Sequence, residues 1–274
     1  MEINIAFSPC PNDTFIFDAL VNEKIDTEGI VFKPTLLDVE TLNQQALQHQ
    51  YDVSKISYGV YHSIASNYLI LDAGSALGSG VGPLLVAHAH QQNCKIEEQQ
   101  IAIPGELTTA HFLFSAAYPN ATKKVFLRYD EIEEFVLQQK GLGVIIHENR
   151  FTYQDKGLSK IIDLGAFWEQ EKGCAIPLGG IVIKRSFPQS IQKQINLLIQ
   201  KSIAYAHEQY PRLSSYVKMH AQEMETSVMR KHIDLYVNAY SISLGKVGKQ
   251  AINKMLQVQR GKDFPLDDIF VSMD

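Results

Sequence analysis

Cysteine is scarce in this chain, and no long stretch of one charge is present. The 274 residues include 3 cysteines, Cys10, Cys94 and Cys174, whose scattered positions suit neither a disulfide framework nor a zinc site. The formal net charge is −5 and the basic residues are dispersed. A protein built to neutralise nucleic-acid phosphates or to bind an anionic membrane surface would be basic instead. We therefore expect neither nucleic acid nor a membrane as a partner.

Two further absences concern location and cofactors. The N-terminal residues lack the basic start and apolar core of a secretory signal, and no apolar stretch is long enough to span a bilayer, so we expect a cytoplasmic protein. No glycine-rich phosphate motif follows a strand and opens a helix. His88 and His90 lie two positions apart, which is not the helical spacing of a metal-binding pair. The sequence thus predicts no nucleotide cofactor and no metal.

What the chain does contain is a regular alternation of apolar runs with helical periodicity. Its 45% hydrophobic and 20% charged residues are typical of a globular protein. Short apolar runs predict strands at residues 3–7, 30–37 and 53–56, with helices at residues 14–21, 39–49 and 58–66. This order predicts a largely parallel sheet covered by helices on both faces, and therefore the α/β class.

A second α/β lobe is predicted after the glycine-rich segment 74–83. Its expected elements are strands at residues 101–103 and 142–146 and helices at 108–118 and 130–139. A return strand at 179–184 is followed by helices that should pack on the first lobe, at residues 189–207, 212–221, 227–238 and 246–259. We predict a larger lobe of residues 1–88 plus 185–274 and a smaller lobe of residues 89–184.

The loops that leave the predicted strands are the places to look for a site, since ligands of open parallel sheets bind beyond the carboxyl ends of the strands. In the first lobe, residues 8–13 deliver a helix start whose free N–H groups suit an anion. A well-capped turn is the alternative for this segment. Residues 55–58 combine an ammonium, a hydroxyl and a helix start, which could hold a carboxylate, although an exposed lysine is also common.

The second lobe offers two comparable loops. Residues 105–110 set hydroxyls and backbone donors at the first turn of a helix, where Thr108 or Thr109 could also be a simple cap. The strand at 142–146 ends on His147, and histidine titrates near neutrality, which makes it a candidate general base. The chain has 9 histidines, so position alone does not decide whether His147 is catalytic.

Four segments, SPCPNDTF at 8–15, DVSKIS at 52–57, GSGVGPLLV at 78–86 and GVIIHE at 143–148, together resemble the 1,4-dihydroxy-6-naphthoate synthase family of the futalosine route to menaquinone. The resemblance implies a fold like type II periplasmic binding proteins, with two α/β lobes and an interdomain cleft. It also implies a carbon–carbon lyase that converts cyclic de-hypoxanthine futalosine, a small carboxylate, to 1,4-dihydroxy-6-naphthoate without an external cofactor.

The resemblance further implies roles for particular residues. His147 corresponds to the family's general base, and the corresponding substrate contacts are Lys55, Ile56, Ser57, Thr109 and Ala110. We also expect Ser8, Asn12 and Asp13 to line the floor of the site.

Two rival functions stay open. The first is a chorismate dehydratase-like enzyme of the same pathway, and the second is a non-catalytic protein that binds a small carboxylate, because one fold serves many functions. The motif at residues 8–13 and a histidine at a strand end favour the synthase. Whether the protein forms a homodimer is left open.

Overall fold

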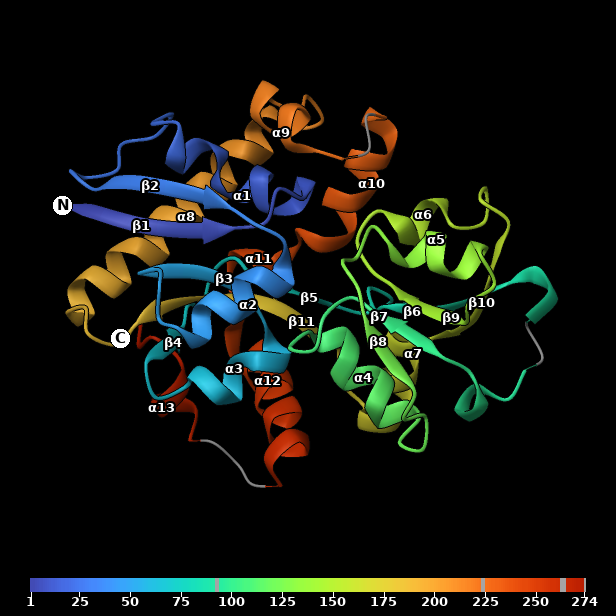
Figure 1. Ribbon diagram of the computed structural model, residues 1–274. Helices are drawn as coiled ribbons and strands as arrows, with labels where there is room; N and C mark the ends of the chain where they lie inside the picture. Colours follow the sequence, from blue (N-terminus) through green and yellow to red (C-terminus); the bar gives the residue numbers. More distant parts are fainter. Residues whose placement is uncertain (92–93, 223–224, 262–264, 274) are drawn as a thin grey trace. The chain divides into compact units, whose positions relative to one another are not determined.

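The computed structural model describes residues 1–91, 94–222, 225–261 and 265–273, and it shows two compact α/β units (Figure 1). The first unit comprises Met1–Gly78 and Pro177–Asp274, and the second comprises Ser79–Ile176. The chain therefore leaves the first unit one strand before the predicted boundary after residue 88, and re-enters it one strand before the predicted boundary after residue 184. An apolar strand does not indicate from its sequence which of two sheets it joins, and this is why both boundaries were set too late.

The sheet of the first unit has the strand order β2-β1-β3-β11-β4, with β5 paired to β11. The strands β1 (Glu2–Phe7), β2 (Val31–Leu36) and β3 (Val53–Ser57) are parallel. The long strand β11 (Ile176–Lys184) runs antiparallel to β3 and to β4 (Tyr68–Ile70). The sheet is thus mixed, and the glycine-rich segment 74–83 contributes to it the strand β5 (Ala76–Gly78).

Helices of the first unit follow each parallel strand and then dominate the C-terminal part of the chain. Those after the strands are α1 (Pro11–Val21), α2 (Val39–Leu47) and α3 (Tyr58–Ile64). The later ones are α8 (Gln189–Gln209), α9 (Ser215–His220), α10 (Thr226–Tyr236), α11 (Ala239–Ile242), α12 (Gly245–Arg260) and α13 (Leu266–Ile269). No helix in the described part of the chain is long and apolar enough to cross a membrane.

The core of the first unit explains why these elements form. Alternate residues of β1, namely Ile3, Ile5 and Phe7, are completely buried against apolar side chains of α1 and α8, which lie beside β1 and β2 in Figure 1. The period of two is that of a strand with one face on the core. Residues of α9 and α10 join the same cluster, which confirms that the C-terminal helices pack on the first unit.

The sheet of the second unit has the order β10-β6-β9-β7-β8. Its strands are β6 (Leu84–His88), β7 (Ile101–Ile103), β8 (Lys124–Phe126), β9 (Leu142–Ile145) and β10 (Leu158–Asp163). Its α-helices are α4 (Thr109–Ala117), α5 (Ile132–Leu137), α6 (Asn149–Thr152) and α7 (Leu164–Lys172), and two short 3₁₀ turns span Ala89–Gln91 and Ile96–Glu98. The strands β7, β8 and β9 are parallel, whereas β6 is antiparallel to both of its neighbours.

Two adjacent glycines allow β11 to pass closely against β3. A Cβ atom on Gly180 would lie 2.3 Å from the hydroxyl of Tyr58, and one on Gly179 would lie 2.6 Å from the carbonyl oxygen of Ile56. Neither distance is tolerated by real side chains, so the glycines are required for this pairing. They hold the carboxyl end of β3, where candidate site residues lie, against the return strand.

Candidate functional site

In the first unit, the predicted site residues lie at the carboxyl ends of neighbouring parallel strands. The register pairs Ile5 with Val53 and Ala6 with Ser54, so β1 and β3 end side by side. The loop that begins at Ser8 therefore meets the end of β3, where Lys55 and Ser57 lie. This is the edge at which open α/β sheets bind their ligands.

Asp13, in the first turn of α1, is the centre of a buried hydrogen-bond network. Its Oδ2 accepts from the Ser8 hydroxyl at 2.7 Å and from the Ser8 N–H at 3.2 Å. Its Oδ1 accepts from the Asn12 amide at 2.9 Å and from the Lys55 ammonium at 2.8 Å. Four donors on one carboxylate satisfy its hydrogen-bonding capacity, so Asp13 organises the loop.

Lys55 forms the only buried ion pair of this network in the described residues. Its side chain is 7% exposed and that of Asp13 is 2% exposed. The ammonium also donates to the carbonyl oxygen of Gly74 at 3.1 Å. An ammonium has three N–H donors. Residues in the described part of the chain accept two of them, so one remains for a ligand. The predicted cation is therefore already neutralised by Asp13, and what Lys55 can offer a substrate is a single hydrogen bond.

A histidine from the C-terminal helices completes the network, and no local sequence pattern predicts its contact. The Nε2 atom of His232, on α10, lies 2.9 Å from Oδ1 of Asn12, and His232 is completely buried. Because the Asn12 amide nitrogen donates to Asp13, its oxygen is the acceptor, and the histidine carries the proton on Nε2. His232 thus fixes the orientation of Asn12 from 220 residues away in sequence.

Ser57 is held by a different side chain. The Oδ1 atom of Asn43 accepts from the Ser57 N–H at 2.8 Å, and the Asn43 amide donates to the Ser57 hydroxyl at 3.1 Å. Ser57 stands at the N-cap of α3 but makes no side-chain capping bond. Its oxygen therefore accepts from Asn43, and no residue in the described part of the chain accepts its own proton, which can be donated to a ligand. Ile56, between Lys55 and Ser57, is completely buried in the strand.

In the second unit, two loops likewise follow neighbouring parallel strands. The register pairs Ile101 of β7 with Leu142 of β9 and Ala102 with Gly143. The loop after β7 leads into α4, and the Thr108 hydroxyl there accepts from the N–H of His111 at 3.2 Å and donates to Gly105 at 2.9 Å. Thr108 is therefore the cap of α4.

Thr109 and Ala110, which follow the cap, form the first turn of α4. Both are buried, with exposed fractions of 3% and 4%. The first N–H groups of a helix have no acceptor within the helix, and the helix dipole places partial positive charge there. This turn can donate to an oxygen anion.

His111 and Lys124 support the same loop. The Nδ1 atom of His111 lies 2.7 Å from the carbonyl oxygen of Glu106, so it is the protonated nitrogen. The Lys124 ammonium lies 3.2 Å from Nε2 of the same ring and 2.7 Å from the Ser115 hydroxyl. Burial lowers the pKa of His111 below its usual value, and burial likewise lowers the pKa of Lys124. The His111 ring therefore favours the neutral form. Its contacts with the Glu106 carbonyl and with Lys124 connect the loop to β8.

His147 follows β9 with an unusual backbone. Its φ is 57°, in the left-handed region that residues other than glycine rarely adopt and that costs about 1–3 kcal/mol when the surroundings enforce it. The imidazole is half-buried, and its ring packs edge-on against Tyr129 at 5.0 Å between centroids. Strained residues of this kind concentrate at functional sites. A histidine whose ring is oriented by its backbone and by a neighbouring ring, at the end of a strand, can act as a general base.

Two mixed α/β units, each with polar residues at the carboxyl ends of its parallel strands, define a protein with the fold of the periplasmic binding proteins. A solved structure from Archaeoglobus fulgidus is similar, with a TM-score of 0.89, 29% identity and coverage of 95% of this chain and 97% of that one. The aliphatic sulphonate binding protein SsuA from Escherichia coli has a TM-score of 0.67 at 8% identity, over 99% of this chain and 92% of its own. At such low identity the SsuA likeness concerns the fold alone.

The sequence comparisons are more specific. A family described as menaquinone biosynthesis matches residues 3–260. A 1,4-dihydroxy-6-naphtoate synthase from Thermus thermophilus is 40% identical over 254 residues, which is 92% of each chain. A protein of the same name from Streptomyces coelicolor is 35% identical over 260 residues, 93% of this chain and 91% of its own. The chain belongs to this menaquinone-biosynthesis family and is an enzyme, as the four sequence segments predicted.

Proposed function

We propose that this enzyme is a 1,4-dihydroxy-6-naphthoate synthase that cleaves cyclic de-hypoxanthine futalosine, with His147 as the general base. The observation that carries the proposal is the identity of 40% and 35% to two proteins of that name, over more than nine-tenths of the chain. The left-handed backbone of a half-buried histidine at the end of β9 supports the assignment of the base.

The proposed reaction is a retro-aldol-like cleavage. A neutral imidazole at His147 takes a proton from a hydroxyl of the bound substrate, and the carbon–carbon bond to the sugar-derived fragment breaks as the hydroxyl becomes a carbonyl. The electron pair of that bond enters the carbocyclic ring as an enolate, and the imidazolium returns its proton to the enolate oxygen. Tautomerisation of the ring, in which a proton moves from carbon to oxygen, then makes it aromatic. Aromatisation supplies the driving force, so the proposal requires no cofactor.

Substrate binding is assigned to both units. In the first, Ser57 donates its hydroxyl proton and Lys55 its remaining N–H to substrate oxygens, while Ser8, Asn12 and Asp13 shape the loop beside them. In the second, the buried first turn of α4 at Thr109 and Ala110 binds the carboxylate, because helix starts favour anions. Ile56 contributes through its place in β3.

The decisive experiment is incubation of the purified protein with cyclic de-hypoxanthine futalosine, without added cofactor, and detection of 1,4-dihydroxy-6-naphthoate by mass spectrometry. His147→Asn should lower kcat by about 10²–10⁴-fold, the usual contribution of a general base. Asparagine tolerates the left-handed conformation, so the backbone should be preserved.

The chain offers a matched control for this variant. His49 also has a positive φ, of 55°, and is exposed at the end of α2, so His49→Asn makes the same change and should keep full activity. Near-normal turnover by His147→Asn would remove His147 as the base. If the folded wild type forms no product, the synthase assignment fails, and chorismate turnover or ligand binding without turnover would identify which rival is correct.

A further inference from the structure

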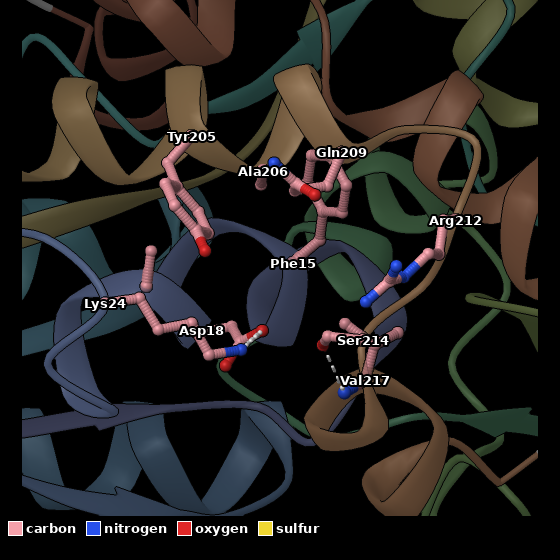
Figure 2. A pocket seen from close by; sticks show the side chains of 10 residues that line it. Phe15, Asp18, Lys24, Tyr205, Ala206, Gln209, Arg212, Ser214 and Val217 are labelled. Carbon is pink, nitrogen blue, oxygen red and sulfur yellow. Dashed lines mark hydrogen bonds and ion pairs between the residues drawn. The ribbon is translucent and has the colours of Figure 1, made fainter.

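A cavity of the first unit lies away from the strand ends that carry the proposed site. It has a volume of about 320 Å³, at the lower end of the ~300–1,000 Å³ that is typical of small-molecule sites. Its walls come from α1, the loop after α1, α8 and the segment that leads into α9 (Figure 2). The residues that line it are Phe15, Asp18, Ala19, Lys24, Tyr205, Ala206, Gln209, Arg212, Ser214 and Val217.

One part of the lining is apolar and well ordered by packing. Phe15 is 3% exposed and Val217 is 1% exposed, and the Phe15 ring packs edge-on against Tyr210 at 5.9 Å between centroids. Ala19 and Ala206 add small side chains that leave the space open. Such a surface suits the flat face of an apolar ring, because contact removes apolar area of the ring and of the cavity wall from water.

The charges around the cavity do not cancel. Asp18, whose side chain is 9% exposed, is neutralised by the Lys24 ammonium at 2.6 Å and accepts from the Asn22 amide at 2.8 Å. Among the residues that the structure describes, the Arg212 guanidinium has no carboxylate partner, and it points into the hollow in Figure 2. One positive charge is therefore left over, on the side chain that binds planar anions best.

Two neutral groups also face the same space. The hydroxyl of Tyr205 and the amide of Gln209 make no hydrogen bond to another described side chain, and both line the hollow. Ser214 differs, because its oxygen is occupied as the cap of α9, where it accepts from the Val217 N–H at 3.3 Å. The cavity thus combines an apolar face, one uncompensated guanidinium and two neutral hydrogen-bonding groups.

We propose that this cavity is a second ligand site, for a small monocarboxylate with a flat apolar body. The carboxylate pairs with Arg212 through two parallel hydrogen bonds, the body lies on Phe15 and Val217, and Tyr205 and Gln209 bind a polar substituent. A second negative charge on the ligand is disfavoured because, among the described lining residues, the other cation, Lys24, is already paired with Asp18. The inference is independent of the proposed function, although both sites share α1, which begins with the Asn12 and Asp13 network.

The test is a titration of the full-length protein, labelled with ¹³C at alanine methyl groups, with 2-naphthoate as the probe. Ala19 and Ala206 report on the cavity, and Ala110 reports on the start of α4 in the other unit. The Ala19 and Ala206 signals should shift saturably, and Arg212→Gln should weaken that binding at least about tenfold, as expected for a hydrogen bond to a charged group.

Two comparisons make the result specific. Lys218→Gln removes one positive charge from the exposed face of α9 and should leave the affinity unchanged. The neutral probe 2-naphthamide should bind at least about tenfold more weakly than 2-naphthoate. Shifts confined to Ala110, equal binding of the two probes, or unchanged binding by Arg212→Gln would each overturn the proposal.

Discussion

The two units of this enzyme end their parallel strands in different ways. In the first unit, β1 and β3 lead into a closed network in which the buried carboxylate of Asp13 accepts four hydrogen bonds. In the second unit, β7 and β9 lead into a capped helix start and into His147 with its left-handed backbone. The fully hydrogen-bonded carboxylate of Asp13 stabilises one geometry of its loop, whereas the second unit presents a histidine with a strained backbone and a helix start whose dipole favours an anion. In the function that we propose, the first unit supplies hydrogen bonds to substrate oxygens, and the second supplies the general base.

The largest effect on stability should come from breaking the buried ion pair of the first unit. Lys55→Met leaves the Asp13 carboxylate buried without its cation, which typically costs about 3–5 kcal/mol. The free energy of unfolding, measured in urea, should fall by that amount. The double variant Asp13→Leu, Lys55→Met removes both charges and should recover part of the loss.

An exposed pair in the same unit provides the control for this prediction. The Lys201 ammonium lies 2.6 Å from the Glu28 carboxylate, but the two side chains are 54% and 44% exposed. Exposed pairs contribute little, because solvent already stabilises the separate charges. Lys201→Met should hardly change the unfolding midpoint. Equal losses from Lys55→Met and Lys201→Met would contradict the view that the network is a structural centre.

The fold and the loops that carry the candidate site could be predicted because both depend on local patterns. The alternation of apolar and polar residues at the start of β1 and the helical periodicity of α8 can be recognised in the sequence. The sequence pattern does not predict the strands β8 and β10, because β8 has 3 residues and β10 does not alternate, with Leu158 buried, Lys160 exposed and its last three residues partly buried. Short strands of this kind are defined by their neighbours in the sheet and not by their own sequence.

The partners of the site residues could not be predicted, since they depend on contacts between distant segments. Lys55 was expected to be a cation for a substrate carboxylate, and its pairing with Asp13 follows only from the adjacent ends of β1 and β3. The role of His232 cannot be predicted from local patterns, because its contact with Asn12 spans 220 residues. The packing of α10 against the rest of the first unit brings these two residues into contact.

The cap of α4 offers a sharper test of the second unit. Thr108→Ala removes the capping bond and should reduce the free energy of unfolding by about 1 kcal/mol with little change in KM. Thr109→Val, one residue further, keeps the backbone N–H of the helix start and removes the hydroxyl that we propose as a further donor to the substrate carboxylate. It should raise KM about threefold to tenfold, the equivalent of one neutral hydrogen bond, with little change in stability. Ser57→Ala should raise KM as Thr109→Val does, and it should also reduce the free energy of unfolding by about 1–3 kcal/mol, because the buried Asn43 amide loses its acceptor. Steady-state kinetics and urea unfolding separate the two effects, and the reverse pattern would identify Thr109 as structural.

The smallest effect concerns the pH dependence of stability. Burial lowers the pKa of His111 below its usual 6.5, so between the two values the unfolded chain binds more protons than the folded one. Stability from this group is therefore complete above about pH 6.5 and declines as the pH falls through the lowered pKa. His111→Gln removes this dependence, so wild type should lose stability relative to the variant between about pH 7.5 and about pH 5.

A matching variant at His62, in the first unit, separates the effect on stability from the effect on substrate binding. Burial lowers its pKa as well, so His62→Gln should produce a pH-dependent difference of the same sign. Of these two histidines, it is His111 that supports the loop before α4, through its 2.7 Å bond to the Glu106 carbonyl. Of the two variants, His111→Gln should therefore be the one that also raises KM. Unfolding curves and kinetics at several pH values would measure both quantities. A wild type that gains stability relative to either variant as the pH falls would show that the histidine concerned is charged in the folded protein.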